Sequence, residues 1–161
     1  MSRIYSVPFA GGTVTNAGGN ADLWEFLPAD DKPIKLRGFT FGQISEVGDA
    51  AEEGVEIQVI RLGATVTGSN GSSVTPVPMD SADAAAGFTA ETNGATVATT
   101  TGTTTIMESC PWNLRASPYE KWYPDERFCP KAKQGEGLFI RLLTTVADDI
   151  TFGGCAWIEE E

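Results

Sequence analysis

Apolar and polar residues alternate along most of this chain, and this period of two constrains the fold more than any other feature. Over residues 55–59, valine and isoleucine alternate with glutamate and glutamine, which is the pattern of a strand buried on one face. Residues 4–9 alternate in the same way. Residues 138–143 are apolar on both faces, as expected for a central strand. The pattern predicts about nine or ten strands.

Helix signals are few. Residues 45–53 are one candidate for a helical turn or two, because Asp49 and Glu52 are placed as a capping box and Gly54 as a terminator. Residues 81–86 are a weaker candidate. We therefore predict one all-β domain over residues 1–161, an antiparallel β-sandwich with long loops and at most one or two short helical turns. A jelly roll is one form that such a sandwich takes.

Glycines and loop-rich stretches give further local predictions. The apolar phase changes after Gly38, which indicates a β-bulge. The pair at residues 11–12 predicts a turn. Residues 63–80 are rich in Gly, Ser, Thr and Pro and predict a long surface loop. Residues 88–107 predict a long hairpin broken near Asn93-Gly94.

Charge and residue types exclude several function classes. The chain has no histidine and a net charge of -11, so the side chain that titrates near neutral pH is missing. No phosphate loop or dinucleotide fingerprint occurs. An acidic surface repels phosphate backbones and anionic lipid. We expect no enzyme, no cofactor, no metal, no nucleic-acid partner and no membrane; the charge suits a basic partner.

The cysteines and the N-terminus bear on the compartment. Cys110, Cys129 and Cys155 are odd in number and widely spaced, so reduced, buried thiols are expected, with Cys155 in the core. A Cys110–Cys129 pair is the alternative in an oxidising medium. The first six residues enter an alternating pattern without an apolar signal region, which predicts a protein made and kept in a cytoplasm.

Four carboxylates, Glu46, Asp49, Glu52 and Glu53, lie within eight residues. Converging oxygens favour a Ca²⁺ site or an acid/base pair, whereas the alternative is a solvated acidic turn between strands. The spacing matches no calcium-loop pattern, so the turn is the preferred interpretation.

The most distinctive stretch is residues 111–128, which is rich in aromatic residues and prolines. Aromatic residues and Arg are concentrated at protein interfaces. The candidate interface residues are Trp112, Tyr119, Trp122, Tyr123 and Arg127. The alternative is a long loop whose rings cover one end of the core. A carbohydrate platform would need Trp112, Trp122 and Tyr123 exposed in one plane.

Two further stretches, DKPIKLRG at residues 31–38 and GQISEVGDAAEE at residues 42–53, resemble small structural proteins encoded in the head-gene region of tailed phages. The resemblance covers the first third of the chain well and the rest in outline. It implies a capsid decoration (cement) protein that binds the major capsid protein on the outer surface of the assembled head, often as a homotrimer. The location implied is the virion, and the host cytoplasm during assembly. The alternatives are a carbohydrate-binding module of a phage tail or receptor-binding structure, and a minor head–tail connector.

Overall fold

The computed structural model describes residues 2–16, 20–45, 53–94, 96–116, 118–143 and 145–161. These residues form fourteen strands and one 3-10 turn, η1 (Glu126–Phe128). The strands are β1 (Arg3–Val14), β2 (Ala21–Leu27), β3 (Ile34–Gln43), β4 (Gly54–Leu62), β5 (Val66–Thr67), β6 (Ser72–Val74), β7 (Val77–Pro78), β8 (Thr89–Thr92), β9 (Thr99–Thr100), β10 (Thr104–Asn113), β11 (Tyr119–Trp122), β12 (Lys131–Ala132), β13 (Gly137–Leu142) and β14 (Ile150–Glu160).

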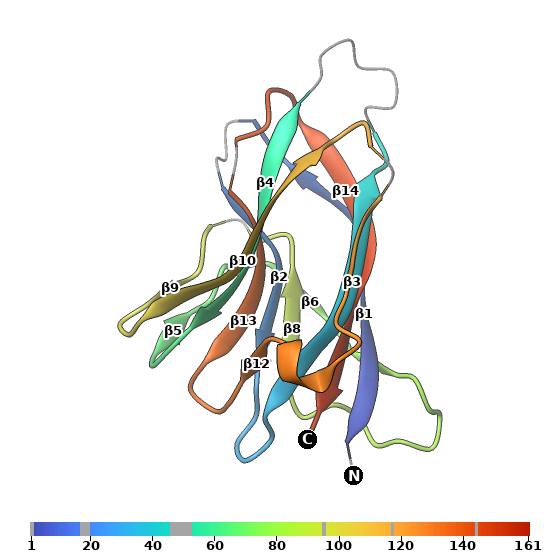
Figure 1. Ribbon diagram of the computed structural model, residues 1–161, viewed down its shortest axis with the longest axis vertical. Coiled ribbons are helices and arrows are strands. Elements are labelled where there is room, and N and C mark those ends of the chain that lie inside the picture. Colours follow the sequence, from blue (N-terminus) through green and yellow to red (C-terminus); the bar gives the residue numbers. More distant parts are fainter. Residues whose placement is uncertain (1, 17–19, 46–52, 95, 117, 144) are drawn as a thin grey trace.

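Two six-stranded sheets pack face to face (Figure 1). Sheet A has the order β11-β3-β14-β1-β7, with β12 also paired to β3. Sheet B has the order β10-β4-β13-β2-β8-β6, and β5 and β9 form a small separate ribbon. All strand pairs are antiparallel. The predicted antiparallel sandwich is confirmed, and β13 is the predicted central strand.

The principal strands are nested as in a jelly roll. β1 pairs with β14, β2 with β13, β3 with β11 and β4 with β10. The first half of the chain therefore runs antiparallel to the second half as one long folded ribbon. Each step along these eight strands changes sheet, except the step from β4 to β10. This winding is the double-sheet jelly-roll arrangement.

Trp24 of β2 lies at the centre of the core. Its side chain is fully buried and meets the rings of Phe9, Phe39 and Phe41 at centroid distances of 5.3, 6.4 and 6.2 Å. The indole N–H donates to the carbonyl oxygen of Val7 at 3.2 Å, so the polar atom of the ring is satisfied. Burying an aromatic side chain of this kind contributes about 1.5–3 kcal/mol. The inward residues of both sheets join this single cluster.

Glycine marks the bulge in β3. Gly38 lies opposite Trp157 of β14 and Leu36 lies opposite Ile158, so Arg37 is the extra residue. The inward positions accordingly change from even to odd numbers, and Leu36 and Phe39 are both buried. The bulge predicted from the phase change is confirmed.

The turn predicted at residues 11–12 is wrong. β1 continues to Val14, and its register against β14 shifts between Ala10 and Gly12. Gly11 has a φ of 75°, a left-handed conformation that glycine adopts without strain. The glycines therefore serve a bulge within the strand.

Residues 63–103 form an insertion between β4 and β10 that extends both sheets. β7 adds to β1, β8 adds to β2, and β6 adds to the outer side of β8. The long loop predicted at residues 63–80 is wrong, because it contains β5, β6 and β7. The hairpin predicted at residues 88–107 is also wrong, because its two halves pair with other strands. β7 and β8 pair with the otherwise free edges of β1 and β2. The alternation of residues within a segment does not show which strand it will pair with.

A buried ion pair holds part of this insertion. Arg141 of β13 donates to Asp22 of β2 at 2.5 and 3.0 Å, and the Asp22 carboxylate also accepts the Ala98 backbone N–H at 2.7 Å. The Ala98 carbonyl accepts a second bond from Arg141 at 3.0 Å. A small apolar cluster separate from the main core lies beside it and comprises Ile60, Leu62, Ala98 and Phe139. The insertion therefore covers part of sheet B.

Two other buried carboxylates bind the insertion through its backbone. Glu25 accepts bonds from the backbone N–H and the hydroxyl of Ser69, both at 2.8 Å. Glu160 accepts the N–H groups of Gly87 and Phe88 at 2.6 and 3.2 Å. Glu25 and Glu160 are each only 3 % exposed. Since buried charges need such partners, the acids fix the path of the insertion.

The limit of one or two short helical turns is confirmed, since η1 is the one helical turn in the described ranges. Residues 81–83 form a turn and a bend, and residues 84–86 have no regular secondary structure, so that helix prediction is wrong. Asp80 explains it, because its side chain accepts the Ala82 N–H at 2.9 Å and closes a local turn. Of residues 45–53 only the two ends are described, so Asp49 and Glu52 lie outside the described residues. Gly54 begins β4.

Candidate functional site

Three of the five candidate interface residues face the interior. Trp112 is 7 % exposed and packs edge-on against Phe41 at 5.0 Å. Tyr119 stacks on Phe39 at 5.5 Å. Tyr123 is buried, and its hydroxyl donates to Glu108 at 2.9 Å. These rings close the core between the edge strands β10 and β11. The segment is not the long loop of the alternative interpretation, because its described residues include the end of β10, β11 and η1.

The other two candidates, Trp122 and Arg127, face solvent. Trp122 is 47 % exposed at the end of β11, and the Arg127 side chain, within η1, is 84 % exposed. With Trp112 and Tyr123 buried, the three rings named for a carbohydrate platform do not lie exposed together. The interface role stays a prediction for Trp122 and Arg127.

The ring beside Trp122 is Trp157 of β14, which the sequence analysis had not singled out. Trp122 and Trp157 belong to the two strands that pair with β3 on either side. Their ring centroids are 4.5 Å apart and their planes meet at 31°. Gly38 pairs with both residues, and a Cβ there would lie 2.5 Å from Trp122 Cε3. The absent side chain of Gly38 is therefore what lets the two rings meet.

These indoles form one wall of an open groove that crosses the outer face of sheet A, here called the sheet A groove. Its volume is about 480 Å³. Besides Tyr123, its lining residues are Ile4, Arg37, Met79, Trp122, Pro124 and Trp157. Ile4 and Met79 are 39 % and 60 % exposed. An open concave surface with this apolar lining is typical of a binding site.

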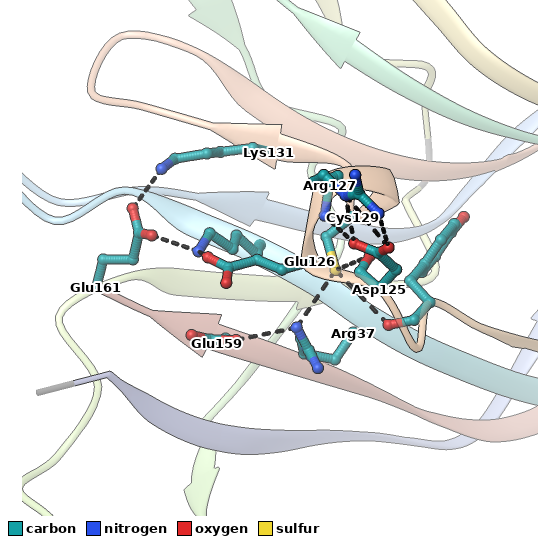
Figure 2. Close-up of polar contacts among 10 residues, drawn as sticks. Arg37, Asp125, Glu126, Arg127, Cys129, Lys131, Glu159 and Glu161 are labelled. Carbon is teal, nitrogen blue, oxygen red and sulfur yellow. Dashed lines mark hydrogen bonds and ion pairs between the residues drawn. The ribbon is translucent and has the colours of Figure 1, made fainter.

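A network of charged residues borders the groove (Figure 2). Lys35 of β3 binds both Glu126 of η1 and Glu161, and Lys131 also binds Glu161. The side chain of Lys35 is only 6 % exposed. Hydrogen bonds to Glu126 and then Glu161 raise the pKa of Lys35. The bond from Lys35 lowers the pKa of the Glu126 carboxyl, and bonds from Lys131 and then Lys35 lower that of Glu161. The network ties η1 and the end of β14 to β3.

Arg37, the bulge residue, connects this network to the groove. Its guanidinium lies 3.4 Å from the Glu159 carboxylate and donates to the Cys129 sulfur at 3.5 Å (Figure 2). The Cys129 thiol in turn donates to the carbonyl oxygens of Tyr123 and Asp125, each at 3.7 Å. Arg37 is therefore held in place as a wall of the groove.

All three cysteines are free thiols. Cys129 is buried, while Cys110 and Cys155 are half-buried. Burial raises the pKa of the Cys129 and Cys155 thiols, which makes them less nucleophilic. The prediction of Cys155 as a core residue is wrong. Its neighbour Ala156 points into the core, so the alternation of β14 directs Cys155 to the outer face.

Within the described ranges, no group of three Asp, Glu or Cys side chains is placed to hold a metal ion. Glu53, the described member of the acidic group at residues 46–53, accepts the Ala147 N–H through both oxygens at 3.1 Å. Glu46, Asp49 and Glu52 lie outside the described residues. Among the described helical residues, none form a helix long and apolar enough to cross a bilayer.

Comparisons of the chain with protein-family models, curated proteins and solved structures found no match. The sheet A groove is an extended apolar concavity on the described part of the chain. Of its residues, sequence reasoning had singled out Trp122 and Tyr123. Trp157 was detectable, because the alternation of buried Ala156 and Ile158 places it on the opposite face. No sequence signal placed Ile4 and Met79 in the groove, since they come close together only because β7 pairs with β1.

Proposed function

We propose that this protein is a non-enzymatic virion structural protein, a capsid decoration protein that binds the major capsid protein on the outer surface of the assembled head. The observation that carries the proposal is the sheet A groove, an exposed apolar surface lined by two tryptophans, a methionine and an arginine. These residue types are enriched at protein–protein interfaces. The head-protein resemblance of residues 31–38 and 42–53 supplies the identity of the partner.

The groove wall is ordered before a partner binds. Trp122 is fixed by its stack on Trp157 and by a hydrogen bond from its indole N–H to Glu120. A surface that is ordered before binding loses less conformational entropy when the partner arrives. A decoration protein that meets its contacts only on the assembled shell adds its binding free energy to the assembled state.

The lining of the groove favours a protein partner over a sugar. Sugar sites need several polar groups that fix the hydroxyls in addition to a stacking ring. Here Ile4, Met79 and Pro124 surround the indoles, and Arg37 is already bonded to Glu159 and Cys129. The carbohydrate-binding alternative is therefore kept as an outcome of the test below.

The test is binding of purified protein to heads stripped of their decoration. We expect saturation at a fixed, symmetry-related copy number and an increase in the temperature at which the heads break down. Trp122→Ala should weaken binding by about 2 kcal/mol or more if the ring is a buried anchor. Ile106→Ala is the matched control, because Ile106 is 57 % exposed on β10 of sheet B.

Two results would contradict the proposal. One is failure of the wild-type protein to bind stripped heads under any condition in which it is folded. The other is retention on a glycan array through Trp122, which would assign the groove to a carbohydrate. Equal loss of head binding in the Trp122 and Ile106 variants would show that the capsid contact is not specific to the groove on sheet A.

A further inference from the structure

The acids around the sheet A groove indicate what kind of segment it binds. Glu120 accepts a hydrogen bond from the Trp122 indole N–H and is itself exposed. Asp80 follows Met79 and is also exposed. Neither carboxylate forms an ion pair with any residue that the structure describes. Glu120 thus places a negative charge at the Trp122 indole, and Asp80 adds one next to Met79 in the chain, each without a paired cation among the described residues.

The cations near the groove are already neutralised. Arg37 lies 3.4 Å from Glu159, and Arg3 lies 3.4 Å from Asp83. A carboxylate has room for several hydrogen bonds, so Glu120 retains acceptor capacity beyond its bond to Trp122. A cation that reached Glu120 would also lie near the indole of Trp122, and indoles are the best aromatic partners for cations.

We propose that the sheet A groove binds a partner segment in which a bulky apolar side chain is flanked by Lys or Arg. The apolar side chain packs against Met79, Ile4 and Trp157. A flanking cation lies over the Trp122 indole and pairs with Glu120. This assignment rests on the proposed function only in taking the groove as the docking site, and it specifies the chemistry of the occupant.

Charge also argues against a second copy of this chain as the occupant. Each chain has a net charge of -11. Two grooves placed face to face would bring Glu120 and Asp80 of one copy toward the same acids of the other. Like charges across an interface are unfavourable, whereas a basic segment both neutralises the rim and is attracted by the whole molecule.

Three short capped peptides can test this inference on the full chain, with the central sequences Lys-Phe-Lys, Glu-Phe-Glu and Lys-Ser-Lys. The protein is labelled with fluorotryptophan, which gives one fluorine NMR signal for each of its four tryptophans. We expect Lys-Phe-Lys to shift the signals of Trp122 and Trp157. The buried Trp24 and Trp112 should not respond. The affinity for Lys-Phe-Lys should exceed that for Glu-Phe-Glu by about fivefold, the size expected for one exposed charge pair. It should also exceed that for Lys-Ser-Lys, which lacks the apolar side chain.

Glu120→Gln keeps an oxygen that accepts the indole N–H and removes the charge. It should lower the affinity for Lys-Phe-Lys by about fivefold and remove most of the preference over Glu-Phe-Glu. Asp148→Asn is the control, because Asp148 is an exposed acid in a bend before β14 and does not line the groove. Unchanged dispersion of the four fluorine signals shows that each variant is folded.

Equal affinity for Glu-Phe-Glu, or the absence of any shift up to about 1 mM peptide, would overturn the inference. Its failure is distinct from failure of the proposed function. Stripped heads that bind the protein while the basic peptide does not would leave the decoration role and reject this occupant. Peptide binding without head binding would leave the groove chemistry and reject the capsid.

Discussion

Gly38 is the residue on which the groove depends most directly. A Cβ at this position would lie 2.5 Å from Trp122 Cε3 and 2.8 Å from the Lys121 carbonyl oxygen. The backbone atom cannot move away without disturbing the β11–β3 pairing. We expect Gly38→Ala to lower the free energy of unfolding by about 1–3 kcal/mol, as overpacking does, when measured by urea denaturation.

The matched control for Gly38→Ala is Gly54→Ala. Gly54 is also in a strand, and nothing lies within 4 Å of the place its Cβ would take. This variant should retain wild-type stability. If Gly38→Ala is as stable as Gly54→Ala, then the Trp122 ring moves freely and does not form a fixed wall.

Tyr123 should make the protein sensitive to alkali. Burial, followed by the hydrogen bond to Glu108, raises the pKa of this phenol above its usual value of about 10. The folded state therefore keeps a proton that the unfolded state loses. The resulting stabilisation is complete below about pH 10 and is lost as the pH rises toward the folded pKa.

Tyr123→Phe tests this prediction. The variant should be less stable by about 1 kcal/mol at neutral pH, since one buried hydrogen bond is lost. Its stability should then decline less than that of the wild type between about pH 9 and pH 11. Urea denaturation at both pH values measures the difference. Parallel declines would show that Tyr123 ionises as readily in the folded protein as in the unfolded one.

At the residue scale, sequence reasoning succeeded where the cause is local. The bulge beside Gly38 follows from the phase change within one strand. It failed where the outcome depends on a partner strand. Trp112 and Trp122 are equally aromatic in the sequence, yet the pairing of β10 and β11 with other strands buries one and exposes the other.

Among the elements, the insertion at residues 63–103 depends on acids of the sandwich itself. Asp22→Asn removes the charge that pairs with the buried Arg141 and accepts the Ala98 N–H. Breaking a buried ion pair from one side costs about 3–5 kcal/mol. We expect this loss in urea denaturation, together with faster hydrogen exchange at the Ala98 amide.

Asp148→Asn is again the control, as the same change at an exposed bend. It should alter the stability by no more than about 0.5 kcal/mol. Loss of stability in Asp22→Asn without faster exchange at Ala98 would mean that the ion pair stabilises the sheet and does not hold the insertion.

The principal strands were predictable because each has a buried face that imposes a period of two. Residues 55–59 and 138–143 became β4 and β13 for this reason. The short strands β5 to β9 were not predictable. They contain two to four residues each, too few to show a period. β7 and β8 form where the edges of β1 and β2 offer unpaired backbone groups, while β6 adds to β8 and β5 and β9 pair with each other.

For the whole molecule, the two outer faces of the sandwich differ. The insertion covers part of sheet B, where Ala98 packs with Ile60, Leu62 and Phe139. Sheet A carries the open groove with its two indoles. The strand arrangement in Figure 1 shows the insertion crossing from sheet B to the β1 edge of sheet A. Part of the outer face of sheet B is thus covered by the chain itself, whereas the groove on sheet A is open.

The predicted homotrimer belongs to this scale. Because each chain has a net charge of -11, self-association in solution is opposed by repulsion between protomers. Salt screens charges over about 10 Å at 0.1 M. We therefore expect analytical ultracentrifugation to show a monomer at low salt and an increasing trimer fraction as salt rises, or a trimer on the assembled head, where the lattice holds three copies together around a symmetry axis.

Trp122→Ala decides which contact the groove makes. If the groove binds the capsid, this variant should trimerise like the wild type at high salt while losing affinity for stripped heads. If the trimer fraction falls instead, by the equivalent of about 2 kcal/mol for a buried anchor, the groove is the contact between protomers. In that case the inference of a basic occupant fails, because the occupant would be an acidic second copy. A monomer at every salt concentration and on particles would reject the trimer itself.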